Sequence, residues 1–395
     1  MLSGFKAVTS ADRRPANRGG SRRMKLLTSI LASGVIPVAM CAAPAAAARA
    51  QDAPPASASK DAAPKGGDQQ AARGKDETTA AGKPASVPFG PSVYASAVAS
   101  KPPSASKSMP PATSDLMVLR KFWDAYNAGL ADRMKQVYPV NIRRDTIGGI
   151  PVEIVTPAGG VKPQNRGRVL VNLHGGGFMW GAGAGGEVEA IPIAAIGGFE
   201  VITVDYRMAP EAHFPAASED VAAVYQALLK RYQAKSIGIY GCSAGGILTA
   251  QSVAYIIQKR LPAPGAIGTF CGSAAEIGGD TAKLAPITTG ETFTDDFEVN
   301  LPYFKGASRN DPTLFAVKSP ELLRQFPPTL LIAGSRDFTL SSLFQTQREL
   351  TRVGVVAELH AWDGLAHAFF MDPDIPESKE TYKVVSDFFS RHLRP

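Results

Sequence analysis

From position 169 onward the chain alternates short apolar runs with stretches of helical periodicity, and this alternation restricts the fold more than any other feature. The apolar runs resemble buried strands and lie at Val169–Leu173, Val201–Val204, Ile237–Tyr240, Ala266–Phe270, Thr329–Ala333 and Ala357–Trp362. The helical stretches lie at Glu187–Ile196, Ser218–Arg231, Gly245–Lys259, Ser341–Val353 and Glu377–His392. Strands that alternate with helices form a mainly parallel sheet flanked by helices. The sequence therefore predicts an α/β fold with its ligand site beyond the carboxyl ends of the strands.

Two earlier strands bring the predicted sheet to eight. Gly148-Gly149 separates Val140–Ile147 from Ile150–Thr156, and a two-residue glycine turn between such runs is typical of a hairpin. A helix is predicted to begin near Ser114, a candidate cap, because apolar residues then recur at helical spacing. Together with the glycine- and proline-containing insertion at 278–326, this helix, near 116–135, is expected to form a helical cap or lid.

The net charge of +7 arises from the first fifty residues, which hold eight basic side chains and one acidic one. The remainder of the chain is formally neutral, so the sequence gives no support to a nucleic-acid-binding surface. Basic residues at 22–25 precede an apolar run at 26–43 and an Ala-x-Ala site at 48–50, the order of a signal peptide. We therefore expect residues 1–50 to be removed, and the protein to be periplasmic or secreted. A retained membrane helix is disfavoured by Gly34 and Pro37 within the run, so no transmembrane span is expected in the mature chain.

Residues 51–115 are mostly alanine, proline, serine, glycine and lysine, which cannot bury enough apolar surface to order themselves. We expect a disordered tether there and one folded domain at 116–395. After removal of the leader only Cys242 and Cys271 remain, so no disulfide framework is expected and both are predicted to be buried thiols.

The segment Gly241-Cys242-Ser243-Ala244-Gly245 joins a predicted strand to a predicted helix. This is the context that a Gly-x-Ser-x-Gly turn needs to expose a nucleophilic serine, and its glycines avoid collisions where strand and helix come very close. The pentapeptide is weak evidence alone in a chain with 38 glycines. Its position at a strand end makes Ser243 the candidate nucleophile.

A serine nucleophile needs a base and an acid that orients the base. Among the five histidines, His367 is favoured because it follows the last predicted strand after a glycine-containing loop. Asp337 follows the preceding strand and is the favoured acid, with Asp363 and Asp372 as rivals. The order serine, acid, histidine along the chain fits this assignment.

A glycine loop, His174-Gly175-Gly176-Gly177-Phe178, follows the strand Val169–Leu173. Glycines let backbone N–H groups approach a substrate oxygen, so Gly175, Gly176 and Ala244 are the candidate donors of an oxyanion hole. A phosphate loop is disfavoured because neither a Gly-Lys-Ser/Thr sequence nor dinucleotide spacing is present. His174 is expected to brace the loop, and no metal or cofactor is implied.

Four ordered motifs resemble the hormone-sensitive-lipase-like branch of the α/β hydrolases over residues 116–395. They are the His-Gly-Gly-Gly loop, Asp205-Tyr206-Arg207-Met208-Ala209-Pro210-Glu211, Phe214-Pro215-Ala216-Ala217 and the serine pentapeptide. The resemblance implies an α/β-hydrolase fold and the triad Ser243, Asp337 and His367. The segment 205–211 is interpreted as structural. The family usually has aspartate at the place of Cys242 and Pro-Leu at the place of Phe338-Thr339.

We therefore predict a serine esterase that cleaves esters of small to medium acyl groups through an acyl-enzyme. Phe178, Trp180, Cys242 and Phe338 are candidate pocket residues, with core packing the alternative for the aromatic ones. A lactone, amide or thioester could replace the ester, and Cys242 resembles members that open lactones. A homologue that binds ligand without turnover is the alternative from another class. The sequence does not fix the oligomeric state.

Overall fold

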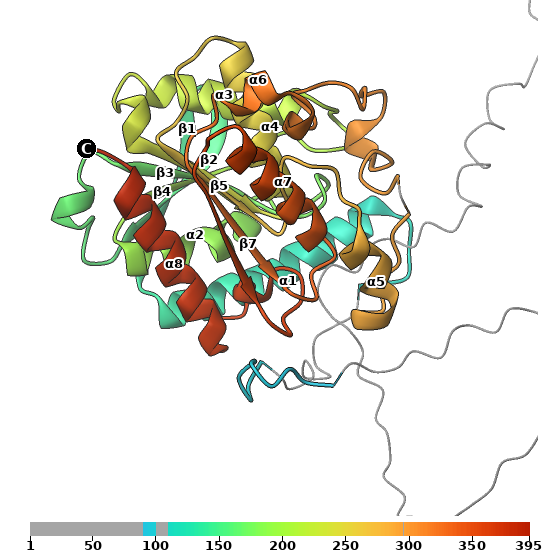
Figure 1. Ribbon diagram of the computed structural model, residues 1–395. Coiled ribbons are helices and arrows are strands. Elements are labelled where there is room, and N and C mark those ends of the chain that lie inside the picture. The colour runs from blue at the N-terminus through green and yellow to red at the C-terminus, as the bar shows by residue number, and fades with distance from the viewer. Residues whose placement is uncertain (1–89, 100–109, 295) are drawn as a thin grey trace, which may run out of the picture. The chain divides into compact units, whose positions relative to one another are not determined.

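A computed structural model describes residues 90–99, 110–294 and 296–395 (Figure 1). Within them, eight strands form one sheet in the order β1-β2-β4-β3-β5-β6-β7-β8. The strands are β1 Val140–Ile147, β2 Ile150–Pro157, β3 Val169–Leu173, β4 Glu200–Val204, β5 Ile237–Cys242, β6 Ala266–Phe270, β7 Thr329–Gly334 and β8 Ala357–Trp362. All eight predicted strands are confirmed, with their ends shifted by two residues or fewer.

The sheet is parallel except at one edge. Ile147 pairs with Ile150 in the antiparallel β1–β2 hairpin, and β2 is also antiparallel to β4. The chain passes from β3 outward to β4 and then returns to place β5 on the other side of β3. The strand order thus reverses between β3 and β5, which is where open α/β sheets bind ligands. Leu173 pairs with Gly241, so the glycine loop and the serine turn leave the sheet side by side.

Helices cover both faces of the sheet (Figure 1). One face is covered by α2 and α8, and the other by α3, α4 and α7. Their bounds are α2 Ala184–Gly197, α3 Ala216–Leu228, α4 Ala244–Gln258, α7 Leu340–Arg352 and α8 Pro376–His392. Along β3, Val169 and Val171 pack on the α4 side and Leu170 packs on the α8 side. Burial on both sides explains why the central strands are continuous apolar runs instead of alternating ones.

The first helix, α1 (Leu116–Val137), lies on α2 and reaches the carboxyl edge of the sheet. Asp115, not the predicted Ser114, caps it, because the Asp115 carboxylate accepts the N–H groups of Met117 and Val118. Arg120 on α1 donates to both carboxylate oxygens of Glu211 and to the carbonyl of Ala209. These bonds confirm a bracing role for one end of the 205–211 segment.

The insertion between β6 and β7 contains α5 (Asp280–Thr288) and the short α6 (Pro320–Leu323). Between these helices Tyr303 and Phe304 are buried against the end of the glycine loop. The hydroxyl of Tyr303 accepts the N–H of Ala217 at the start of α3. The predicted insertion at 278–326 is therefore packed onto the sheet domain through its middle section.

Residues 90–99 contact the folded domain, although the sequence predicts a disordered tether throughout 51–115. Ser96 donates to Glu377 of α8 through both its N–H and its hydroxyl. Ser92 donates to Asp363, and Arg336 donates to the carbonyl of Gly90 at 2.6 Å. Ala95 and Ala99 also pack against the apolar core on the α8 side, so hydrogen bonds and a small apolar contact together hold this short stretch. The predicted signal peptide lies outside the described residues.

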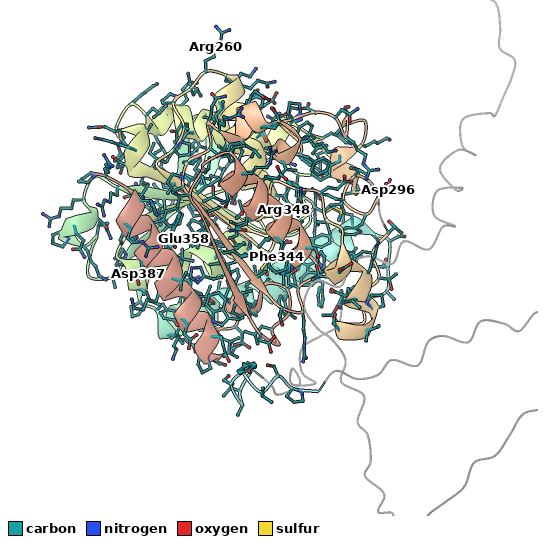
Figure 2. The ribbon with its side chains drawn as sticks, in the orientation of Figure 1. Arg260, Asp296, Phe344, Arg348, Glu358 and Asp387 are labelled. Atoms are coloured by element: carbon teal, nitrogen blue, oxygen red, sulfur yellow. The ribbon has the colours of Figure 1, made fainter. Side chains whose placement is uncertain are left out.

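The outer faces of the helices carry charged side chains, among them Arg348 on α7 and Asp387 on α8 (Figure 2). Phe344 on α7 is a half-exposed exception. Within the described residues, no helix combines the length and the apolar character needed to cross a membrane.

Candidate active site

Ser243 occupies a sharp turn between β5 and α4. Its backbone has φ 58° and ψ −122°, in a region that costs a non-glycine residue about 1–3 kcal/mol. A methyl group on Gly245 would lie 1.8 Å from the carbonyl oxygen of Leu173, and one on Gly241 would lie 2.2 Å from the same atom. The prediction that the motif glycines prevent collisions is confirmed, and the colliding group is the end of β3.

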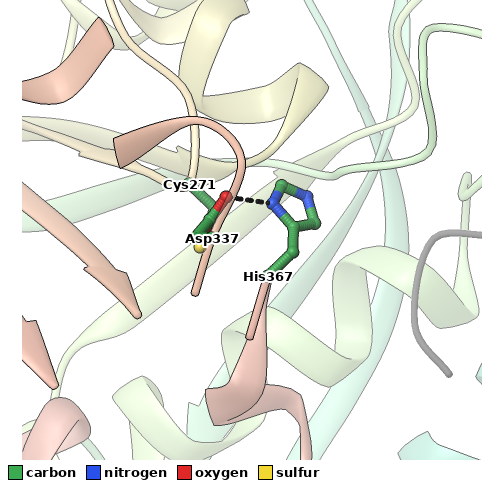
Figure 3. Close-up of side chains that lie close together, drawn as sticks. All are labelled: Cys271, Asp337 and His367. Atoms are coloured by element: carbon green, nitrogen blue, oxygen red, sulfur yellow. Dashed lines mark hydrogen bonds and ion pairs between the residues drawn. The ribbon is translucent and has the colours of Figure 1, made fainter. Parts of the chain in front are cut away.

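Asp337 and His367 meet at the ends of the neighbouring strands β7 and β8 (Figure 3). Nδ1 of His367 lies 2.9 Å from Oδ1 of Asp337, and both side chains are buried. The same oxygen accepts the N–H and the hydroxyl of Thr339, at 2.9 and 2.8 Å. With its proton on Nδ1, the imidazole has Nε2 as its basic nitrogen. This is the arrangement by which an aspartate orients a catalytic histidine.

Charges around the pair favour a protonated imidazole and an ionised carboxyl group. Burial opposes charge on His367, but the charge and hydrogen bond of Asp337, together with Glu291, raise the pKa of His367 above its usual 6.5. Burial also opposes charge on Asp337, yet His367 and the Thr339 donors lower the pKa of this carboxyl group. The site can therefore stabilise an imidazolium that forms during proton transfer.

The glycine loop begins at His174. The imidazole of this residue is buried and stacks on Tyr206, with ring centroids 4.2 Å apart. Nδ1 of His174 lies 2.7 Å from the carbonyl of Gly175, and the hydroxyl of Tyr206 donates to the carbonyl of His174. Burial lowers the pKa of His174, so the ring is neutral near pH 7. The expectation that His174 braces the loop agrees with these contacts.

Gly175 also lines the cavity beside Ser243, but its hydrogen bonding disfavours the oxyanion role that the sequence predicts for it. Its N–H donates to Oε1 of Glu189 at 2.8 Å, so a substrate oxygen would compete with a carboxyl oxygen for this donor. The N–H of Ala244 is at the first position of α4, where helix geometry supplies no acceptor. Gly176 lies at the wall of the same cavity as Ser243. The predicted donors that remain are therefore Gly176 and Ala244.

A family model described as the α/β hydrolase fold matches residues 170–371. These include the glycine loop, the turn at 241–245 that carries Ser243, called the serine elbow, and the Asp337–His367 pair. The match covers more than half of the chain. This chain is an α/β hydrolase. It belongs to the hormone-sensitive-lipase-like branch, the branch that its ordered motifs resemble and that structures of similar fold represent.

Three relatives illustrate the similarity of the hydrolase to known proteins. The crystal structure of esterase E25 is 31% identical, with a TM-score of 0.66 over 78% of this chain and 97% of that one. An acetyl-hydrolase of Streptomyces hygroscopicus is 25% identical over 62% of this chain and 80% of its own. LipR of Mycobacterium tuberculosis, provisionally named an acetyl-hydrolase, is 36% identical over 33% of this chain and 41% of its own.

A cavity of about 50 Å³ opens beside Ser243 in the hydrolase. Ala368, next to His367, lies on its wall, so the serine and the histidine loop share one space. Of the four predicted pocket residues, Trp180 lines this cavity. Its indole stacks on that of Trp123 from α1, with ring centroids 5.7 Å apart.

The other three predicted pocket residues lie elsewhere. Phe178 is fully buried and stacks on Tyr303, so it belongs to the core between the loop and the insertion. Phe338 stacks on the imidazole of His367 with centroids 4.6 Å apart and supports the base instead of the substrate. Cys242 is fully buried within the core on the α8 side of the sheet. Successive side chains along a strand point to opposite faces. Cys242 therefore points into the core, while Ser243 faces the cavity.

Sequence reasoning missed the contribution of α1 to the cavity of the hydrolase. Trp123, Tyr126 and Asn127 all line it. The only signal was an aromatic-rich turn in a helix already predicted to be part of the cap. Glu189 was missed as well, and its signal was a carboxyl residue within an otherwise apolar helix.

Cys271, Asp337 and His367 offer ligand atoms within 4.8 Å of one another, the spacing of a metal site (Figure 3). In the structure these atoms bond to one another and to the backbone: Asp337 accepts from His367, and Sγ of Cys271 accepts the N–H of Ala368 at 3.3 Å. Burial is the main cause that raises the pKa of the Cys271 thiol, which disfavours the thiolate that a metal would need. The group is better described as an acid–base pair with a supporting thiol.

Proposed function

We propose that this carboxylic ester hydrolase is a serine enzyme that acts through an acyl-enzyme. The observation that carries the proposal is the 2.9 Å contact between Asp337 and His367 at strand ends that share a sheet edge with the strained turn at Ser243. A strained turn, an oriented base and backbone donors are the parts that ester hydrolysis by a serine nucleophile requires.

In the proposed reaction, Oγ of Ser243 attacks the ester carbonyl carbon while Nε2 of His367 takes the hydroxyl proton. The resulting oxyanion accepts hydrogen bonds from the N–H groups of Gly176 and Ala244. The C–O bond to the alcohol then breaks, and the imidazolium returns its proton to the departing alcohol. Water repeats the sequence on the acyl-enzyme, releasing the acid and restoring Ser243. Asp337 remains ionised throughout and stabilises the imidazolium.

The size of the cavity favours a short acyl group. A water molecule needs about 10–15 Å³ of such space, so about 50 Å³ holds about four water-sized groups. Trp123 and Trp180 close the cavity with a rigid stacked wall. An acetyl or similarly short acyl group fits this volume, and acetyl-hydrolases are among the relatives.

The described residues that line the cavity offer no feature that favours a lactone over an open ester. The lactone alternative depended on Cys242, and this side chain faces the core instead of the cavity. A homologue that only binds ligand would have no need of the strained serine turn or the ordered acid–base pair. Ester hydrolysis is therefore the function that the site supports best.

We also propose that residues 1–50 direct export to the periplasm or the medium, with no nucleic-acid partner. The proposal depends on the charge, apolar run and Ala-x-Ala order of the leader. Mass spectrometry of the full chain expressed in a Gram-negative host tests it. Cleavage after Ala50 and recovery outside the cytoplasm are expected, whereas an intact cytoplasmic chain would contradict export.

The decisive test of the reaction compares the full chain with Ser243→Ala on nitrophenyl esters of increasing acyl length and on simple lactones. We expect the wild type to hydrolyse the short esters, and we expect kcat of the variant to be lower by about 10⁴-fold or more. A fluorophosphonate should label Ser243 in the wild type alone. Equal activity of the alanine variant would rule out the mechanism, and labelling without ester turnover would rule out the substrate class.

A further inference from the structure

Glu189 is a buried carboxyl residue on α2 that no step of the proposed reaction uses. Its Oε1 accepts the N–H of Gly175 at 2.8 Å. Its Oε2 accepts the N–H of Cys242 at 3.2 Å and Nδ2 of Asn172 at 3.0 Å. These donors belong to the glycine loop, the end of β5 and the body of β3. One carboxyl group therefore connects the loop to the serine elbow across the point where the strand order reverses.

Packing alone does not account for this residue. Taking a carboxyl group out of water is costly, and burial raises the pKa of Glu189 to about 8 even though three donors oppose the shift. An apolar side chain would fill the same space without that cost. Two of the groups that Glu189 bonds are instead the backbone N–H groups of Gly175 and Cys242, which would otherwise lie unpaired at the cavity and in the core beside it.

The two backbone contacts lie directly beside the proposed oxyanion donors. Gly175 precedes Gly176, and Cys242 is two residues before Ala244. A donor stabilises an oxyanion when it lies about 2.7–3.1 Å from the oxygen, so a small shift of the loop relative to the elbow weakens the interaction. The position of Gly176 relative to Ser243 depends on the contacts that hold its neighbours.

We propose that Glu189 is a positioning residue of the oxyanion hole, which holds the glycine loop in register with the serine elbow. The inference rests on the proposed hydrolysis at Ser243. Glu189 acts through Gly175 and Cys242, whose N–H groups its two oxygens accept, while Asn172 supplies a third hydrogen bond.

The test measures kcat and KM for nitrophenyl acetate, and the inhibition constant of a phenylboronic acid, in full-length Glu189→Gln and Glu189→Ala. A boronic acid forms a tetrahedral adduct with the serine and reports on the oxyanion hole directly. Glutamine keeps one oxygen for Gly175 but presents an amide donor to Cys242, so we expect kcat to fall about tenfold. Alanine removes both contacts and should lower kcat about 100-fold. KM should stay within about twofold, and the inhibition constant should rise in parallel with the loss in kcat.

Glu298→Gln is the matched control. Glu298 is also a buried carboxyl residue whose pKa burial raises to about 8, and it also accepts a backbone N–H, but from Ile277 in the insertion. The same chemical change there should leave kcat and the inhibition constant unaltered. Thermal melting of each variant distinguishes a loss of kcat caused by misplaced oxyanion donors from one caused by a less stable fold. If the alanine variant does not fold, the kinetics of Glu189→Gln alone test the proposal.

Two results would overturn the inference. One is a folded Glu189→Gln variant with wild-type kcat and boronate inhibition, and the other is an effect on KM alone. Full activity of Ser243→Ala is a different result, because it contradicts the proposed reaction itself and not the link between Glu189 and the loop.

Discussion

Nδ1 of His367 and Oδ1 of Asp337 lie 2.9 Å apart, although the two residues are 30 positions apart in the chain. The contact exists because β7 and β8 are adjacent and parallel, so the loops that follow them emerge at one edge. Thr339 supplies two further hydrogen bonds to the same carboxylate oxygen and fixes its direction. The imidazole is thus oriented by a rigid, buried acceptor.

Asp337→Asn should lower kcat for nitrophenyl acetate by about 10³–10⁴-fold with little change in fold. An amide can present its NH2 group to Nδ1 and so favour the wrong tautomer of His367. Asp363→Asn is the control, because Asp363 was the rival acid and bonds to Ser92 on the exposed side of the histidine loop. Steady-state kinetics of both variants check the assignment. A large loss in the Asp363 variant, with Asp337→Asn unaffected, would reverse it.

Glu291→Gln should move the acid limb of the kcat/KM profile to lower pH. Activity requires neutral His367, so it rises with pH through the pKa of this residue. Asp337 and Glu291 together hold that pKa above 6.5 against the effect of burial. Removing the Glu291 charge lowers it, so the variant keeps more activity than the wild type below the midpoint.

A pH series from 5 to 9 on one short ester measures this shift, as do relative rates on the acid limb. Glu276→Gln is the control, since Glu276 pairs with Arg309 in the same insertion. A profile for Glu291→Gln that coincides with the wild type, or moves to higher pH, is incompatible with the electrostatic argument.

Trp123→Ala should widen the acyl specificity of the enzyme. The indole of Trp123 stacks on Trp180 at the wall of the cavity, so its removal joins new space to about 50 Å³. We expect the ratio of kcat/KM for nitrophenyl octanoate to that for the acetate to increase about tenfold or more, as one or two accommodated methylene groups would allow. Phe122→Ala, on the same helix turn but not on the cavity wall, should leave the ratio unchanged. Equal ratios in all three proteins would show that the acyl chain does not bind beside Trp123.

Strand ends were readable from the sequence because burial on both faces makes each central strand a continuous apolar run. That is why the sequence could place Asp337 and His367 at adjacent loops. The direction in which a side chain points after a strand ends could not be predicted in the same way. Cys242 turns into the core and Phe178 packs on Tyr303, since the turn geometry at each position decides the face and no local pattern records it.

Contacts between distant segments account for the remaining differences. Trp123 meets Trp180 only because α1 packs on α2, and helical periodicity predicts a buried stripe without naming its partner. The N–H of Gly175, a predicted oxyanion donor, donates to Glu189 of α2, and no pattern in the sequence pairs these two residues. Hydrogen-bond acceptors that arrive from another element are therefore the information that the sequence lacks.

Gly245→Ala should destabilise the fold and remove activity together. The added methyl group would lie 1.8 Å from the carbonyl oxygen of Leu173, a backbone atom at the end of the central strand β3. Relief requires α4 and β3 to separate, and overpacking of this kind costs about 3 kcal/mol or more. For a domain of this size, a loss of that order lowers Tm by about 6–12 °C.

Gly159→Ala is the control, since a methyl group there meets no atom within 4 Å and should leave Tm unchanged within error. Thermal melts followed by circular dichroism compare the two variants. A Gly245→Ala protein that melts and turns over ester like the wild type would show that the elbow can relax without this glycine.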